Sequence, residues 1–248
     1  MNGEPRAYRE MGKTCKTRPI EAVRLEWVPM PPLEDEFPGH TWGFVSEKET
    51  GAVAEVWKTG YPELTGTTLD FIFHPERYAG KVLLAETYET DRFEREFCMF
   101  RCENGKEIIA AMLLRKDDTN RQVELTIGTI LPQHRNVQGM FVRGFPKVVE
   151  WRKRTGAEYL TSFCVTWPDR SPRLLEANGF RLCGIFPGQL VRWTSGGRQY
   201  RGCTVQYYRF IGEGADFSTK REEWSLSPRA ARLWETLEEI NGGDMFRP

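Results

Sequence analysis

The stretch from residue 122 to residue 153 changes from the repeat of a strand to the repeat of a helix, and this limits the fold more than any other part of the chain. In "QVELTIGTIL" the alternation predicts two faces: Val123, Leu125, Ile127, Thr129 and Leu131 on one, and Glu124, Thr126, Gly128 and Ile130 on the other. The apolar residues of "MFVRGFPKVVEW" then repeat at helical spacing, and we expect Pro146 to kink or restart that helix. A strand that leads through a short turn into a helix is a building unit of helix-covered sheets.

The junction "LPQHRNVQG" between these two elements has the composition of an anion-binding turn. A helix that starts after a strand presents unpaired backbone N–H groups and a partial positive charge, and both favour phosphate. Gly139 lets the backbone approach a bulky anion, while Arg135 and His134 add charge or hydrogen-bond donors. Pro and Gly also end ordinary strands, and basic residues favour exposed turns, so the junction alone leaves both interpretations open.

The segments on either side predict a mixed sheet. Strands Glu96 to Arg101 and Glu107 to Arg115 flank the Asn104-Gly105 turn, and Gln122 to Leu131 follows as a third antiparallel strand. After the junction helix come the strand "EYLTSFCV", the helix "PDRSPRLLEANG" and the strand-like runs "FRLCGIF", "QLVRWT" and "CTVQYYRFI". Two short helices, one starting at Gly51 and one in "TLDFIF", precede the sheet. The predicted class is α/β or α+β: an antiparallel meander, then β-α-β-α-β-β, with helices on both faces of a mixed central sheet.

The two ends of the chain are expected to lie outside this domain. Residues 1–45 are rich in Pro and charge and predict an extended arm, an appendage to the domain of residues 46–212. Residues 213–248 form a tail whose helix carries one apolar stripe, made of Ala231, Leu233, Trp234, Leu237 and Ile240. The arm and the tail would either cap a substrate pocket or mediate a homodimer, and the sequence does not choose between these roles.

Charge and cysteine content argue against several classes of function. Lys plus Arg and Asp plus Glu both number 35, so no net charge attracts nucleic acid or an acidic membrane, and we expect neither as a partner. The first residues lack the apolar core of a secretory signal, and no segment approaches the roughly 18 apolar residues of a membrane span, so we expect a soluble, cytoplasmic protein. Six cysteines without a CxxC pair, and three histidines, argue against a metal site. We expect reduced, mostly buried thiols, of which Cys164 or Cys203 would be a nucleophile only beside a base.

Taken in order, the segments from about Val53 to Ile211 resemble the GNAT family of N-acetyltransferases. "VELTIGTILPQHRNVQGM" is similar to the family's motif A, in which Pro132, His134, Arg135, Asn136 and Gly139 take the motif positions. "SPRLLEANGFRLCGIF" is similar to motif B, with matches at Leu174, Glu176, Gly179 and Phe180. The likeness covers about two thirds of the chain, and the motif A loop contains fewer glycines than is usual in the family.

The resemblance implies an N-acyltransferase that uses acetyl-CoA or another acyl-CoA as co-substrate and an amine as acceptor. It implies that the two parallel strands around the junction splay apart to admit the cofactor. The implied cofactor contacts are Thr129, Ile130, Arg135, Asn136, Val137, Gln138, Gly139 and Met140.

The resemblance also bears on the catalytic groups. It offers Glu124 as the base that takes the proton of the amine, and it places Trp167 and Trp193 beside the acceptor site. The Tyr that protonates the leaving thiolate in many members is Leu175 here, so we expect Tyr208, ahead of Tyr207, to supply the acid. The alternative is a non-catalytic GNAT-like module that binds acyl-CoA or a partner protein.

Overall fold

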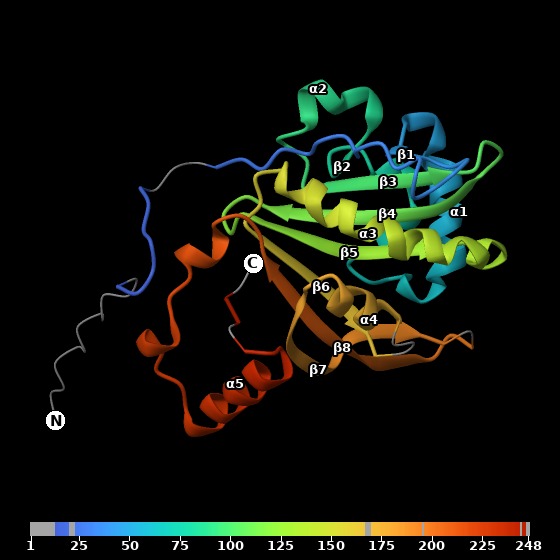
Figure 1. The fold of residues 1–248 in the computed structure, drawn as a ribbon. Helices are drawn as coiled ribbons and strands as arrows, with labels where there is room; N and C mark the ends of the chain where they lie inside the picture. Colours follow the sequence, from blue (N-terminus) through green and yellow to red (C-terminus); the bar gives the residue numbers. More distant parts are fainter. Residues whose placement is uncertain (1–12, 20–22, 167–169, 195, 244, 247–248) are drawn as a thin grey trace, which may run out of the picture.

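A computed structural model describes residues 13–19, 23–166, 170–194, 196–243 and 245–246. Its centre is one mixed sheet with the strand order β1-β3-β4-β5-β6-β8-β7, and β2 pairs with β3 (Figure 1). The strands are β1 Thr41–Phe44, β2 Val82–Leu83, β3 Phe97–Glu103, β4 Ile108–Asp117, β5 Gln122–Ile130, β6 Tyr159–Val165, β7 Arg181–Trp193 and β8 Gln199–Phe210. Strands β3, β4 and β5 form the predicted antiparallel meander, and β6 runs parallel to β5 after a helical crossover. The predicted fold class is confirmed.

Helices cover both faces of this sheet, as predicted. The α-helices are α1 Thr50–Gly60, α2 Tyr88–Asp91, α3 Gln138–Lys153, α4 Arg170–Ala177 and α5 Pro228–Ile240. The 3₁₀ helices are η1 Glu47–Glu49, η2 Pro62–Leu64, η3 Asp70–Phe73, η4 Pro75–Arg77, η5 Ala85–Thr87, η6 Pro132–Val137, η7 Gly214–Phe217 and η8 Arg221–Glu223. We call the side covered by α3 and α4 the α3 face, and the side where α1 and α5 pack the α1 face (Figure 1). Across the described residues, no helix is long and apolar enough to cross a membrane.

A bulge in β5 corrects the predicted faces of that strand. The register with β4 steps from Leu125 to Ile127, so Thr126 is an extra residue without its own partner on β4. Before the bulge, Val123 and Leu125 pack in the core of the α3 face, and after it Ile127 packs in the core of the α1 face. Strict alternation failed because one inserted residue shifts all later side chains to the opposite face.

Four further elements differ from the sequence-based expectation. "FRLCGIF" and "QLVRWT" form the single strand β7, whose register against β8 shifts between Phe186 and Leu190. Pro146 lies inside a continuous α3. The short strands β1 and β2 were not predicted, because four and two residues are too few for a periodic signal.

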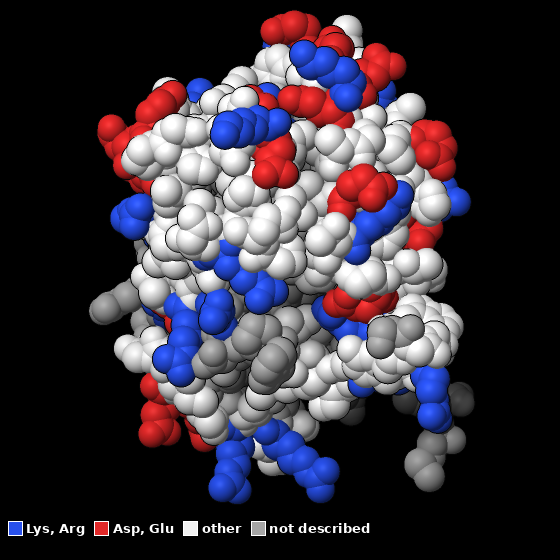
Figure 2. Space-filling model, turned by 90° about the vertical axis from the view of Figure 1, so that its right-hand side faces the viewer, with Lys and Arg blue, Asp and Glu red and all other residues white. Residues whose placement is uncertain are grey.

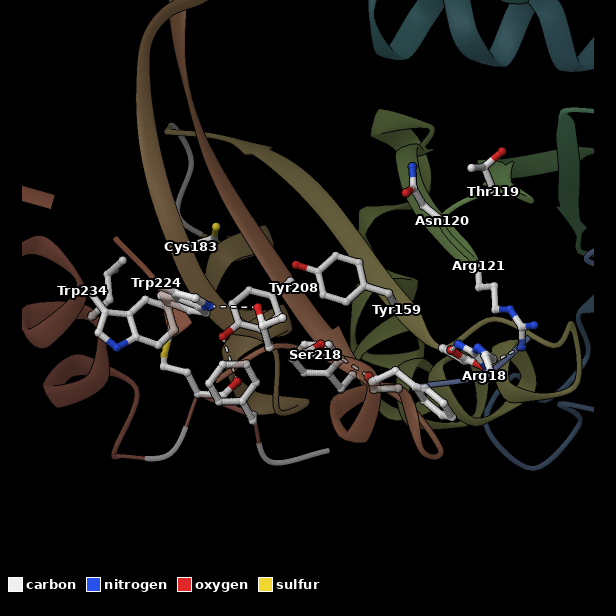
Figure 3. A pocket seen from close by; sticks show the side chains of 18 of the residues that line it. Arg18, Thr119, Asn120, Arg121, Tyr159, Cys183, Tyr208, Ser218, Trp224 and Trp234 are labelled. Atoms are coloured by element: carbon white, nitrogen blue, oxygen red, sulfur yellow. Dashed lines mark hydrogen bonds and ion pairs between the residues drawn. The ribbon is translucent and has the colours of Figure 1, made fainter. Parts of the chain in front are cut away.

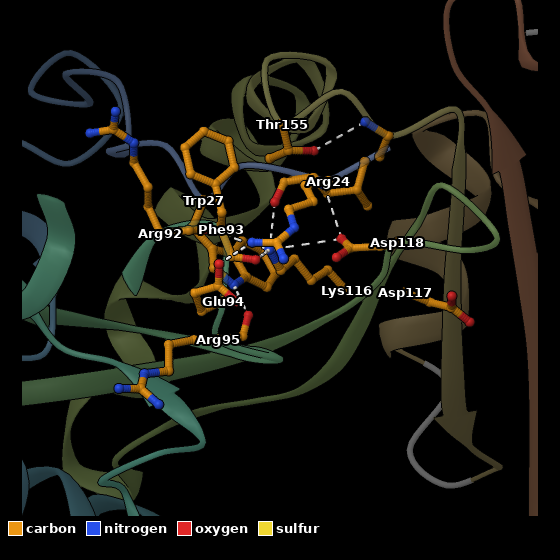
Figure 4. Close-up of polar contacts among 12 residues, drawn as sticks. Arg24, Trp27, Arg92, Phe93, Glu94, Arg95, Lys116, Asp117, Asp118 and Thr155 are labelled. Carbon is orange, nitrogen blue, oxygen red and sulfur yellow. Dashed lines mark hydrogen bonds and ion pairs between the residues drawn. The ribbon is translucent and has the colours of Figure 1, made fainter. Parts of the chain in front are cut away.

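The described part of the arm, residues 13–19 and 23–45, packs against the rest of the chain, and residues 1–12 and 20–22 of the predicted arm lie outside the described residues. The side chains of Leu25, Trp27 and Phe37 are buried, and the ring of Phe37 lies so close to Gly144 in α3 that a Cβ there would be 2.2 Å away. Lys116 on β4 fixes the arm to the sheet, since its ammonium donates to the Leu25 and Phe93 carbonyls (Figure 4). The apolar residues between the prolines and charges of this segment therefore belong to the main core.

The tail docks through only part of its predicted apolar stripe. Leu237 is buried and Trp234 is partly buried against the sheet, whereas Leu233 is 57% exposed and Ile240 is 61% exposed. Ser227 caps the start of α5, because its hydroxyl accepts the N–H of Ala230.

Candidate active site

Strands β5 and β6 diverge halfway along their length. They pair from Gln122↔Tyr159 to Leu125↔Ser162 and then separate, and the Ser162 hydroxyl donates to the Leu125 carbonyl at 3.1 Å where they part. Beyond this point the edge of β5 has no neighbouring strand. Because the Leu131 N–H donates to Ile109 on the other side, alternation directs the backbone groups of Gly128 and Ile130 into the gap between β5 and β6. Ile130 and Thr129, predicted to contact a cofactor, thus lie beside the gap.

Tyr61, at the end of α1, reaches this open edge from the α1 face. Its hydroxyl donates to the Gly128 carbonyl at 2.8 Å. The approach is close, since a Cβ at Gly60 would lie 2.2 Å from the Thr129 hydroxyl. Beside Tyr61, Glu63 of η2 pairs with Arg192 of β7 and thereby links α1 to the far side of the gap. Burial raises the pKa of Tyr61 to about 12, so its hydroxyl stays protonated near neutral pH.

Tyr61, Glu63 and Arg192 were not predicted from the sequence. These residues are far apart in the chain, and only the sheet order brings them together. The one local signal was the "GYPEL" end of α1, where a Gly permits close packing and a Tyr follows it.

Glu124 lies on the α1 face of β5, before the strands diverge. Its neighbours across the sheet are Arg115 on β4 and Thr161 on β6, and Thr161 pairs in turn with Tyr208 on β8. Burial raises the pKa of the Glu124 carboxyl, while the Arg115 guanidinium and the Thr126 hydroxyl lower it to a lesser extent. A partly buried carboxylate whose pKa is raised suits the removal of a proton near neutral pH.

The two tyrosines predicted as acids point to opposite faces of β8. Tyr207 lies on the α3 face, where its hydroxyl donates to Glu176 at 2.7 Å. Tyr208 shares the α1 face with Glu124, and its hydroxyl donates to the Met245 carbonyl in the tail at 2.9 Å. Neither of these hydrogen bonds is directed toward the open edge of β5.

The predicted phosphate turn is a 3₁₀ helix that leads directly into α3. The N–H groups of His134 and Gln138 are already used, by the Leu131 and Arg135 carbonyls. Val137 is buried and Met140 packs against its cluster, so the side chains of these two predicted contacts belong to the core.

The other predicted contacts of this turn lie at the surface. Arg135, Asn136 and Gly139 are exposed, and Gln138 accepts a hydrogen bond from Arg170 of α4 at 2.7 Å. Arg143, one helical turn beyond Gly139, is exposed as well, and neither Arg135 nor Arg143 has an ion-pair partner among the described residues. Figure 2 shows the end of the molecule where this turn lies, with Lys and Arg gathered on its lower half. The turn therefore offers cationic side chains more than free backbone donors.

Thiols and metal ligands add little to this site. Burial raises the pKa of the Cys164 thiol to about 11, which disfavours the thiolate that a nucleophile needs. Cys203 is partly buried, and all six cysteines are free. Within the described ranges, no group of three or more His, Cys, Asp and Glu residues is arranged to hold a metal. Trp193 is 38% exposed on β7, and Trp167 lies outside the described residues.

No family model and no curated protein matches the sequence. The structure, in contrast, matches solved acetyltransferases. The ribosomal-protein-S5-alanine acetyltransferase from Vibrio fischeri matches with a TM-score of 0.55 and 12% identity, over 77% of this chain and 99% of that chain. An acetyltransferase from Salmonella typhimurium, solved with its cofactor acetyl-CoA, matches with a TM-score of 0.52 and 15% identity, over 73% and 98%. A phosphinothricin N-acetyltransferase matches with a TM-score of 0.50 and 16% identity, over 70% and 99%. The chain has the GNAT fold that the sequence predicted.

Proposed function

We propose that the protein is a GNAT-type N-acyltransferase that moves an acetyl or other acyl group from a coenzyme A thioester to an amine. The observation that carries the proposal is the separation of β5 from β6 after Leu125, which leaves the backbone groups of Gly128 and Ile130 directed into the gap. An extended amide chain such as pantetheine can pair with such an edge as an added strand would. The neighbouring turn, with Arg135 and Arg143 exposed, suits the pyrophosphate.

The fit is better in the gap than in the turn. Because the N–H groups of His134 and Gln138 already donate to carbonyls of this turn, fewer backbone donors remain for phosphate. Arg135, Arg143 and the exposed backbone at Gly139 would hold the anion instead, with Asn136 and Gln138 beside them. Binding that depends on guanidinium groups weakens as salt concentration rises, since exposed charges are screened.

The reaction needs a base and a donor for the leaving group. The bound acyl-CoA supplies the activated acyl group. Glu124 takes the proton of the attacking amine, directly or through a water, as the carbon–nitrogen bond forms and the carbon–sulfur bond breaks. Tyr61, released from the Gly128 carbonyl when the cofactor's amide takes that position, donates a hydrogen bond to the departing sulfur. The thiolate then takes a proton from solvent, because a tyrosine with a pKa of about 12 keeps its own.

Tyr61 replaces Tyr208 and Tyr207 in this proposal because its hydroxyl already contacts the open edge of β5. Tyr207 stays as the second choice, since Cys164 of β6 lies near both Tyr61 and Tyr207.

Calorimetry with acetyl-CoA tests the proposal. We expect binding to the purified protein, and Gly139→Glu should weaken it at least about tenfold, because a carboxylate beside Arg143 competes with phosphate. Gly51→Glu is the matched control: Gly51 is also an exposed glycine in the first turn of a helix, with open space around it, and it should bind within about twofold of the parent. No binding, or equal binding by Gly139→Glu, contradicts the proposal.

Release of free thiol in the presence of amines separates an enzyme from a binding module. If the protein binds acetyl-CoA but none of the amines causes release of free thiol, it is the non-catalytic binding module. We further infer a cytoplasmic location, since six free cysteines fit a reducing compartment. A homodimer through the exposed Leu233 and Ile240 side of α5 would appear as twice the chain mass in light scattering, and Leu233→Glu would abolish it.

A further inference from the structure

A cavity of about 800 Å³ lies on the α1 face, where β5 and β6 begin (Figure 3). Its floor is formed by β6 and β8 through Tyr159, Tyr208 and Phe210. Its other walls come from the turn between β4 and β5, which carries Arg121, and from the arm and the tail, the two segments outside the predicted domain. A cavity of this size holds a small organic molecule.

The arm and the tail are fastened to each other over this cavity. The Thr14 hydroxyl donates to the Glu223 carboxylate, and the Lys16 ammonium pairs with Asp216 at 2.7 Å. The Arg18 guanidinium lies 3.9 Å from the centre of the Phe217 ring. These contacts make the cavity a constructed feature of the chain rather than a gap between loosely placed ends.

One end of the cavity is aromatic. On the sheet side, the ring centres of Tyr159 and Phe210 are 5.2 Å apart, and on the tail side those of Trp224 and Trp234 are 4.6 Å apart. The indole N–H of Trp234 is buried and has no partner among the described residues. Rings on two sides favour a flat, unsaturated group, because stacked or edge-on aromatic pairs gain more than burial alone.

The other end is charged and rigid. Arg121 donates to Glu158 at 2.9 Å through one nitrogen, and no described residue accepts from its remaining donors. Among the described residues other than glycine, Arg121 has a left-handed backbone, with φ of 47°, a conformation that is uncommon for such residues. Asp117 fixes the turn, since it accepts the N–H and the side-chain amide of Asn120 at 3.0 and 2.7 Å. A guanidinium held in this way suits a carboxylate or phosphate.

Glu124 is not among the residues that line the cavity, and its Cα lies about 10 Å from each end. Tyr208 and Glu124 are in one row across the sheet, separated by Thr161, which places their Cα atoms about 10 Å apart. Arg121 precedes Glu124 by three residues, in the turn that leads into β5, also about 10 Å along the chain. A ligand that lies over Tyr208 is therefore in the same row across the sheet as Glu124.

We propose that this cavity binds the acceptor, and that the acceptor is an aromatic amino acid or a compound of the same design. The ring lies between Tyr159 and Trp234 and the carboxylate at Arg121. The adjacent amine lies on the side of the cavity toward Glu124, which is itself outside the lining. The amine loses one proton and forms a bond to the acyl carbon as the carbon–sulfur bond breaks, so the products are an N-acyl amino acid and free coenzyme A. This inference rests on the acyltransferase function proposed above.

Calorimetry with four probes tests each part of the design. L-tryptophan should bind, whereas tryptamine, which lacks the carboxylate, and L-leucine, which lacks the ring, should bind at least about tenfold more weakly. Arg121→Asn should abolish the preference for L-tryptophan over tryptamine while keeping the turn, because Asn tolerates the left-handed region. Trp234→Leu should weaken L-tryptophan at least about fivefold, and Leu233→Ala, on the exposed side of the same helix, should not.

The outcomes separate this inference from the proposed function. Equal affinity for L-leucine overturns the aromatic wall, and tighter binding of AMP than of L-tryptophan overturns the amino acid as the ligand of this cavity. A protein that binds acetyl-CoA but not L-tryptophan loses this inference alone. A protein that binds L-tryptophan but not acetyl-CoA loses the acyltransferase proposal, and the cavity then has a ligand but no acceptor role.

Discussion

Replacing Arg152 by Met should stabilise the protein, although Arg152 lies in the core. The side chain is 0% exposed, and none of its three guanidinium nitrogens has a hydrogen-bond partner among the described residues. The guanidinium carbon lies 5.7 Å from the centre of the Phe145 ring. A buried cation without an acceptor loses its hydration and gains little in return.

The size of this cost follows from the pKa of the group. Burial lowers the pKa of the Arg152 guanidinium far below its ordinary value, to about 9. That difference corresponds to about 5 kcal/mol against the charged form in the folded state. The folded pKa is depressed for a basic group, so the cost is fully present below about pH 9 and disappears as pH rises toward the ordinary pKa of arginine. Met fills a similar volume without charge, and after loss of the Phe145 contact we expect a net gain of about 2–4 kcal/mol at pH 7.5.

Lys116 provides the opposite case in the same core. Its ammonium is also buried, and burial lowers its pKa, but it donates to the Leu25 and Phe93 carbonyls (Figure 4). Lys116→Met removes both hydrogen bonds and leaves two buried carbonyls without a donor, so we expect the free energy of unfolding to fall by about 1–3 kcal/mol. The arm should also loosen, which hydrogen exchange would detect at the amide of Trp27, whose N–H donates to Arg92.

Urea denaturation followed by tryptophan fluorescence measures both variants, with the denaturant slope as the check that the unfolding transition itself is unchanged. The reasoning fails if Arg152→Met lowers the free energy of unfolding by more than about 1 kcal/mol, because the guanidinium would then have partners worth more than its burial costs. It fails equally if Lys116→Met leaves both stability and exchange of the arm unchanged.

Three further predictions concern the proposed site. Glu124→Gln should lower kcat about 10²–10⁴-fold with acetyl-CoA affinity unchanged. The base acts in its deprotonated form and Arg115 lowers the pKa of Glu124, so Arg115→Gln should move the acidic limb of the pH profile of kcat to higher pH. If the limb does not move, it belongs to another group. Tyr61→Phe should lower kcat about tenfold and Tyr207→Phe less than about twofold, with the reverse order favouring Tyr207 as donor. Gly60→Ala should lower the midpoint of thermal unfolding, because its Cβ would meet a side chain of β5 at 2.2 Å; an unchanged midpoint would mean that α1 is not packed this closely.

The order of the elements could be predicted from the sequence, because it depends on local repeats and turns. A pattern of about ten residues is enough to predict the Asn104-Gly105 hairpin, the strand before Pro132 and the helix after it. The separation of β5 from β6 was expected from the family resemblance and is seen where Leu125 and Ser162 end the pairing.

The contents of the site could not be predicted in the same way. Tyr61 reaches Gly128 from a helix 67 residues away, a contact that no local pattern encodes. The walls of the cavity join Arg18 to Trp234 across almost the whole chain. The arm looked solvated because its prolines and charges dominate its composition, whereas Leu25 and Trp27 decide its packing.

The bulge at Thr126 connects these observations, because one inserted residue gives β5 two different neighbourhoods on the same face. Before the bulge, the α1 face of β5 carries Glu124, and after it the same face carries Ile127 and Thr129. If Thr126 were paired with β4 in regular alternation, Ile127 and Thr129 would face α3, and α1 could not rest its last turn against Thr129. Tyr61 would then lose its approach to Gly128. The bulge therefore places the proposed base, Glu124, and the proposed hydrogen-bond donor, Tyr61, on the same face of the sheet. One lies before and the other after the point where β5 and β6 separate. At this point, an acyl group that enters along the gap would meet an amine held over the α1 face.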